Sequence, residues 1–97
     1  MKMYGLSDAV IDSIRRLAVR FSIDKVLLFG SRARGDYRER SDIDLAVYGE
    51  LASLFGMEVD ETAPTLLKFD IVDMTAPVQP ELLESIRREG VVLYEKI

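Results

Sequence analysis

Hydrophobic residues recur at helical spacing in some segments of the chain and at strand spacing in others. Apolar residues follow Ser7 at helical spacing, and because serine is a good N-cap we predict a helix over residues 8–21. The same period begins at Pro80 and ends at Gly90, two residues that favour the start and the end of a helix. A weaker helical pattern covers residues 50–60. Three helices are therefore expected.

Four shorter segments have the patterns of β-strands, namely residues 25–29, 42–48, 66–74 and 91–94. The first is almost continuously apolar, which is typical of a strand buried on both faces. The second and third alternate, so each has one apolar face and one face that carries carboxylates. The order helix, strand, strand, helix, strand, helix, strand predicts an α+β fold with a small sheet.

Composition restricts the size of the protein and the kinds of site it can hold. The 97 residues, 48% of them hydrophobic, are enough for one modest core, so we predict a single domain over residues 1–97. Cysteine and histidine are absent, which excludes disulfides, thiolate or imidazole metal sites and histidine-based triads. A bound metal must therefore be a hard cation on oxygen ligands, Mg²⁺ or Mn²⁺ before Ca²⁺.

Charge and hydropathy limit the partners that the chain can have. No apolar run approaches the roughly 18 residues of a membrane span, and no secretory signal follows Lys2, so we expect a cytoplasmic protein without a membrane partner. The net charge of −4 argues against stable nucleic-acid binding. The charge is uneven, however. A cationic loop, suited to a small polyanion, contains four arginines within nine residues: Arg32, Arg34, Arg38 and Arg40.

Two motifs lie at the ends of that loop. Gly30–Gly35 (GSRARG) follows the first strand as a glycine-bearing turn, whose backbone N–H groups can bind phosphate oxygens. Asp42 and Asp44 open the next strand two positions apart, so their Cα atoms lie roughly 6.5–7 Å apart on one face. Two carboxylates that close together repel each other unless a cation lies between them. Each motif alone is common, as an ordinary turn or as a solvated acidic strand.

Together with Asp70, these two motifs form a candidate catalytic site. It lies in the third predicted strand, on the face whose alternation matches that of Asp42 and Asp44. Three carboxylates converging from two strands are costly without cations, and they fit two divalent metals about 3.5–4 Å apart that clamp the oxygens of a displacement at phosphorus. We interpret Tyr37, near the loop, as partial cover of the core. The residues therefore predict a nucleotide-handling enzyme.

The motifs resemble those of the minimal nucleotidyltransferases of the DNA polymerase beta superfamily. The resemblance rests on Gly30–Gly35, Ser41–Leu45 and Phe69–Asp73, and it extends over nearly the whole chain. The most similar branch is the short prokaryotic proteins paired with a HEPN ribonuclease toxin. This implies the polymerase beta-like nucleotidyltransferase fold, a small mixed sheet with helices packed mainly on one face. It also implies an antitoxin that uses ATP with magnesium to adenylylate a tyrosine of its toxin partner.

The resemblance implies a role for each carboxylate. Asp42 and Asp44 would hold two Mg²⁺ ions, or Mn²⁺ in their place. Asp70 would ligate the metal that activates the acceptor hydroxyl, and would help to take its proton. One departure from the family is the short segment between the second and third strands, which contains Gly56 and Pro64. Nucleobase contacts in that region therefore do not carry over.

The resemblance also implies the phosphate contacts. Gly30 and Ser31 would bind the β- and γ-phosphates of ATP, and Arg32 or Arg34 would neutralise the departing pyrophosphate. Two other functions stay open. One is a binding module that silences a toxin without catalysis. The other is nucleotidylation of a small molecule such as an aminoglycoside, although the chain has no residues left for the extra domain that usually holds such a substrate.

Overall fold

Residues 2–97, which the computed structural model describes, form strands and helices in the alternation expected from the sequence. In chain order they are β1 Lys2–Met3, β2 Leu6–Ser7, α1 Asp8–Arg20, β3 Lys25–Phe29, α2 Gly30–Arg34, β4 Ile43–Tyr48, α3 Ala52–Thr62, β5 Phe69–Asp73, α4 Pro80–Glu89 and β6 Val91–Glu95. The predicted α+β class is confirmed. Over these residues, no helix combines the length and the hydropathy that crossing a membrane requires.

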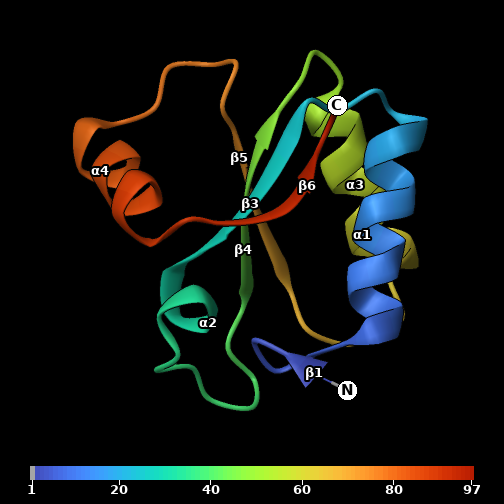
Figure 1. The fold of residues 1–97 in the computed structure, drawn as a ribbon, viewed down its shortest axis with the longest axis vertical. Helices are drawn as coiled ribbons and strands as arrows, with labels where there is room; N and C mark the ends of the chain where they lie inside the picture. Colours follow the sequence, from blue (N-terminus) through green and yellow to red (C-terminus); the bar gives the residue numbers. More distant parts are fainter. Residues whose placement is uncertain (1) are drawn as a thin grey trace.

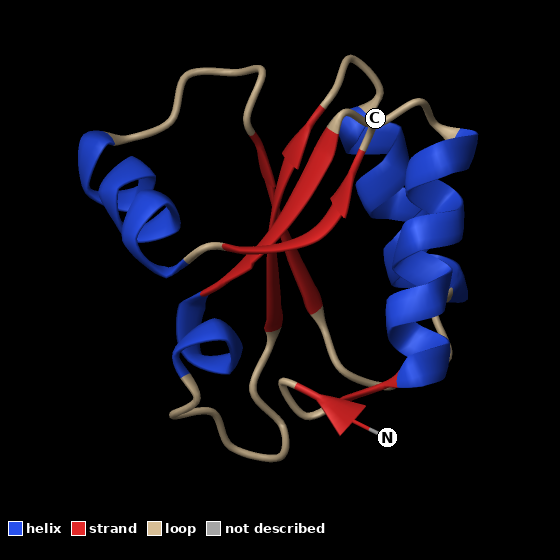
Figure 2. Ribbon diagram, in the orientation of Figure 1, coloured by secondary structure: helices blue, strands red, loops and turns tan. Residues whose placement is uncertain are grey.

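A four-stranded mixed sheet in the order β5-β4-β3-β6 forms the centre of the fold (Figure 2). β3 pairs antiparallel with β4 and with β6, whereas β4 and β5 are parallel. Parallel neighbours need a crossover connection, and α3 supplies it between β4 and β5. This topology brings the end of β3 and the beginnings of β4 and β5 to the same end of the sheet.

Helices lie on both faces of the sheet, with the two longest on one face. Figure 1 shows α1 and α3 on one side of the strands and α2 and α4 on the other. The apolar face of β4 (Ile43, Leu45 and Val47) belongs to the larger core beneath α1 and α3. On the opposite face, Ala46 packs with Ile86 of α4 in a smaller core. The alternation predicted for β4 is therefore confirmed.

Most predicted boundaries agree with the structure to within a few residues. The Ser7 side chain caps α1 by accepting a hydrogen bond from the Val10 N–H, as the sequence indicates. The third strand begins later than predicted, because the residues before β5 form a turn. In that turn the Thr65 hydroxyl accepts a hydrogen bond of 3.1 Å from the Leu67 N–H. Leu66 consequently projects into solvent.

Two short elements were not predicted. The N-terminal hairpin of β1 and β2 turns through Tyr4 and Gly5, both with positive φ. Its strands have two residues each, so no alternation could reveal them. The glycine turn after β3 is a single helical turn, α2, which ends at Gly35 in the left-handed conformation. Five residues are too few for a helical period to be visible in the sequence.

We predict that Ile43→Ala destabilises the protein by about 2–5 kcal/mol, because it leaves a cavity under a fully buried side chain. Urea denaturation with and without the substitution measures this loss. Val92→Ala, on the exposed side of β6, is the matched control and is expected to change stability by about 0.5 kcal/mol or less. Equal effects of the two substitutions would contradict the assignment of the core face.

Candidate active site

Three residues at one end of the sheet lie side by side on neighbouring strands. Asp44 of β4 is paired in register with Phe29 of β3 and with Asp70 of β5. Residues directly opposite each other on neighbouring strands point to the same face of a sheet. The structure therefore brings Asp44 and Asp70 together, on the face that α4 covers. Asp42 precedes the first residue of β4 and is exposed.

The ionisation of Asp44 is affected by the other two carboxylates. Partial burial raises the pKa of Asp44 to about 6, and repulsion from Asp70 and then from Asp42 adds to the effect. The positive charges of Arg34 and Arg32 oppose this rise, but they do not cancel it. A bound cation would stabilise the ionised form of a carboxyl group whose charge is disfavoured in this way. Asp44 is thus close enough to Asp70 and Asp42 for their charges to disfavour its ionisation.

The glycine turn packs directly against this cluster. Gly30 has a φ of +77°, in the left-handed region that favours glycine. A Cβ atom on Gly30 would collide with the Asp44 carboxylate. Any other residue would therefore be strained at this point, where the chain leaves β3 and starts α2. The turn and Asp44, predicted as neighbours, lie against each other.

The residues present fit a divalent cation that arrives with a phosphate. In residues 2–97, no three acidic side chains are close enough to form a complete metal cage by themselves. Mg²⁺ rarely uses such cages, since it is usually held by one or two carboxylates together with substrate phosphates and water. The oxygen-only donor set and the raised pKa of Asp44 agree with this type of binding. The candidate metal ligands remain Asp42, Asp44 and Asp70.

Arg34 is the cationic side chain beside the glycine turn. It lies exposed at the end of α2, and its guanidinium forms ion pairs of 3.1 Å with Glu89 and 3.3 Å with Asp36. Both partners raise the pKa of Arg34, so the group is permanently charged. Ser31, the next residue after Gly30, is half-buried in the same turn. These positions agree with the phosphate-binding role expected for Gly30, Ser31 and Arg34.

Arg32 lies elsewhere than the sequence suggested. Its side chain is only 1% exposed, and the guanidinium donates hydrogen bonds to the carbonyls of Tyr4, Glu39 and Ser41 at 2.9–3.2 Å. It also lies over the Tyr37 ring, 4.9 Å from the centroid. The guanidinium N–H groups that were expected to bind pyrophosphate thus donate to backbone carbonyls inside the protein. They tie the N-terminal hairpin and the cationic loop to α2.

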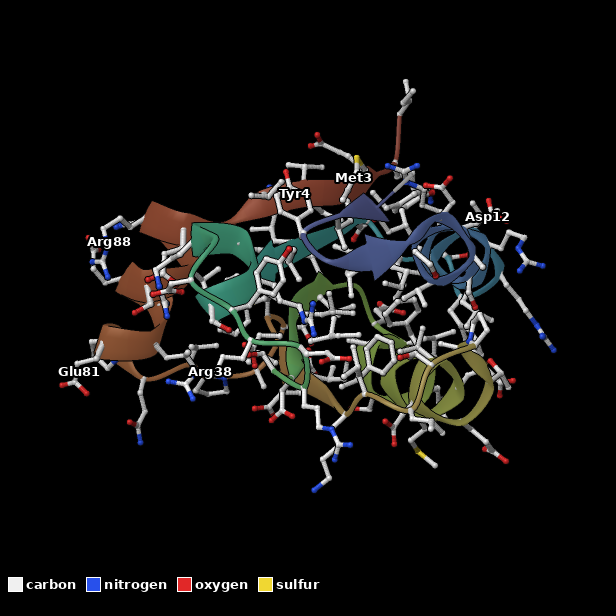
Figure 3. The ribbon with its side chains drawn as sticks, turned by 90° about the horizontal axis from the view of Figure 1, so that it is seen from below. Met3, Tyr4, Asp12, Arg38, Glu81 and Arg88 are labelled. Atoms are coloured by element: carbon white, nitrogen blue, oxygen red, sulfur yellow. The ribbon has the colours of Figure 1, made fainter. Side chains whose placement is uncertain are left out.

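Glu89 is a residue of the site that sequence reasoning missed. It comes from the last turn of α4, beside α2 (Figure 3 views this end of the molecule). Its carboxylate Oε1 accepts hydrogen bonds from the Gly30 N–H and from Arg34 Nη1, each 3.1 Å long. Glu89 lies 59 positions after Gly30, and no local pattern marks it. Only the folding of α4 against α2 brings it to the glycine turn.

The site therefore consists of a glycine turn that lies against Asp44, with Asp70 beside it in register. The chain belongs to the polymerase beta nucleotidyltransferase family, whose model matches residues 12–97. A relative in Methanocaldococcus jannaschii, named a "putative protein adenylyltransferase", is 39% identical over 85 residues, covering 77% of this chain and 82% of the relative. The chain is thus a nucleotidyltransferase, as predicted.

Solved structures share the fold. A toxin–antitoxin with AMP-PNP matches with a TM-score of 0.70 and 23% identity, over 89% of this chain and 73% of that one. A "putative minimal nucleotidyltransferase" matches with a TM-score of 0.64 and 29% identity, over 84% and 86% of the two chains. A "putative nucleotidyltransferase from Sulfolobus solfataricus" matches with a TM-score of 0.59 and 21% identity, over 97% and 81% of the two chains. The expected nucleotidyltransferase fold is confirmed.

We predict that Asp44→Asn makes the metal-free protein more stable at neutral pH. The pKa of Asp44 lies near 6 in the folded state, above the ordinary value of 3.8, so its ionisation opposes folding as the pH rises through 4 to 6. After allowance for solvent screening, the variant should gain about 1 kcal/mol at pH 7.5 and nothing at pH 4. Urea denaturation in EDTA at both pH values measures the difference.

Asp60→Asn on α3 is the control for that measurement, because it removes an exposed charge away from the cluster. Its effect should be small at both pH values. A gain for Asp44→Asn that is the same at pH 4 and pH 7.5, or a loss at pH 7.5, would contradict the proposed repulsion between the carboxylates.

We predict that Arg32→Met destabilises the protein by about 2–4 kcal/mol, because it leaves buried carbonyl groups without donors. Arg32→Lys should not restore stability, since one ammonium group cannot reproduce the planar fork of donors. Arg38→Met, an exposed change in the cationic loop, is the control and should cost about 0.5 kcal/mol or less. Thermal unfolding of the three variants decides whether Arg32 is structural.

Proposed function

We propose that this chain transfers AMP from ATP to a tyrosine hydroxyl of a partner HEPN-type toxin, and so acts as an antitoxin. The observation that carries the proposal is the packing of the Gly30 turn against Asp44, with Asp70 beside it in register. The adenylyltransferase name of the relative and the toxin–antitoxin neighbour with AMP-PNP support the donor and the type of partner. Use of ATP also fits the cytoplasmic location expected from the sequence.

The carboxylates provide the catalytic half of the proposed site. Asp42 and Asp44 are the residues that would hold two magnesium ions. When bound, these ions neutralise phosphate charge and lower the pKa of the acceptor hydroxyl. Asp70 would be a further ligand of one metal, and it accepts the proton of the acceptor. It is exposed on an edge strand, where a second protein can bring its tyrosine.

The glycine turn provides the phosphate-binding half. The Gly30 N–H, together with the Ser31 amide and hydroxyl, binds the β- and γ-phosphates. Arg34 neutralises the pyrophosphate as it leaves. The acceptor oxygen attacks the α-phosphorus in line, and the bond from that phosphorus to the bridging oxygen of the β-phosphate breaks. The products are an AMP ester of tyrosine and pyrophosphate. Arg32 does not touch the nucleotide, and holds the loop that leads to Asp42.

A labelling experiment tests the proposal. The purified protein is incubated with α-³²P-ATP, Mg²⁺ and the small all-helical protein encoded beside it, identified by an Arg-x4–6-His motif. We expect label on the toxin, lost when its acceptor tyrosine is changed to phenylalanine. Asp44→Ala should reduce transfer by about 100-fold or more, because it removes a shared metal ligand. Asp60→Asn is the control and should label normally.

Two results would contradict the proposal in different ways. Neutralisation of the toxin by Asp44→Ala without any labelling would favour the non-catalytic binding module. Transfer of label to an aminoglycoside, with none to the toxin, would favour the small-molecule alternative. Labelling that is insensitive to Asp44→Ala would mean that the site lies elsewhere in the protein.

A further inference from the structure

An acidic side chain of the protein itself occupies the glycine turn. Glu89 Oε1 accepts hydrogen bonds from the Gly30 N–H and from Arg34, each 3.1 Å long. The Glu89 side chain is only 9% exposed, whereas that of Arg34 is 45% exposed. A carboxylate held by a backbone N–H and a guanidinium has the same set of partners as a bound phosphate oxygen.

The two donors that hold Glu89 are those that the proposed function assigns to the triphosphate. The Gly30 N–H and Arg34 cannot fully hydrogen-bond the Glu89 carboxylate and a phosphate at the same time. A nucleotide therefore meets a turn that is already occupied, and its apparent affinity is reduced by the fraction of time that the turn is filled. Removal of the internal anion should then raise the affinity for nucleotide rather than lower it.

The contact is also one that the protein can release. Glu89 is the last residue of α4, and Ile86 is the one fully buried residue of that helix. A second partner is already in place for the carboxylate, because Glu89 Oε2 lies 3.5 Å from Arg88 Nη2. Arg88 is on the outer side of α4, with its side chain largely in solvent (Figure 3). The carboxylate can therefore turn outward without losing every positive neighbour.

We propose that Glu89 sets the nucleotide affinity of the phosphate site by competing with the triphosphate for the Gly30 N–H and Arg34. The proposal rests on the proposed function, since it takes the glycine turn as the phosphate site. In the nucleotide-free protein Glu89 stabilises the turn. When a triphosphate binds, its phosphate oxygens replace the carboxylate, which moves toward Arg88.

Calorimetric titration with α,β-methylene-ATP and Mg²⁺ tests this role, because that nucleotide cannot be cleaved between its α- and β-phosphates. We expect Glu89→Gln to bind about 3- to 10-fold more tightly than the unchanged protein. Glu89→Ala, which removes both contacts, should bind at least as tightly as Glu89→Gln. Both variants should melt at a lower temperature without nucleotide, because a stabilising contact is lost.

Glu84→Gln is the matched control, since it removes the same charge from an exposed position of the same helix, where Glu84 pairs with Arg87. It should change the affinity less than twofold. Weaker or unchanged binding by both Glu89 variants would overturn the inference and make Glu89 a support for Arg34. If neither the unchanged protein nor any variant binds the nucleotide, the proposed function itself fails, and the inference fails with it.

Discussion

The contact between the Gly30 backbone and the Asp44 carboxylate is the constraint on which the site depends. A side chain at Gly30 would overlap Asp44 and would be strained in the left-handed conformation, so glycine is strongly favoured where the chain turns out of β3. This close approach places the proposed phosphate-binding turn directly beside the proposed metal ligands. It also has a cost, since burial and the neighbouring acids raise the pKa of Asp44 to about 6. Such an unfavourable arrangement is typical of functional sites.

The central sheet could be predicted because burial fixes strand register. Ile43, Leu45 and Val47 must share one face, so a strand with a period of two sends Asp44 to the other. The same alternation in β5 places Asp70 on the face of Asp44, and the register confirms it. The association of the acids with the glycine turn was therefore accessible from the sequence.

The parts that could not be predicted depend on contacts between distant segments. Arg32 and Arg34 are two residues apart in a single helical turn, and the packing of the N-terminal hairpin and of the loop around Ser41 decides that the first is buried. Glu89 reaches the turn because α4 folds against α2, which no local pattern records. The hairpin itself has strands too short to show a period. Each of these contacts determines which charged side chains remain available to bind a nucleotide.

A crystal structure with Mn²⁺ and α,β-methylene-ATP tests the central claim most directly, because the anomalous scattering of manganese locates the metal independently of the protein. The account predicts anomalous peaks within bonding distance of the Asp44 and Asp42 carboxylates, one of them shared with Asp70, and the β- and γ-phosphates on the Gly30 turn. Manganese bound away from Asp44, or a triphosphate that does not touch the turn, would contradict the account.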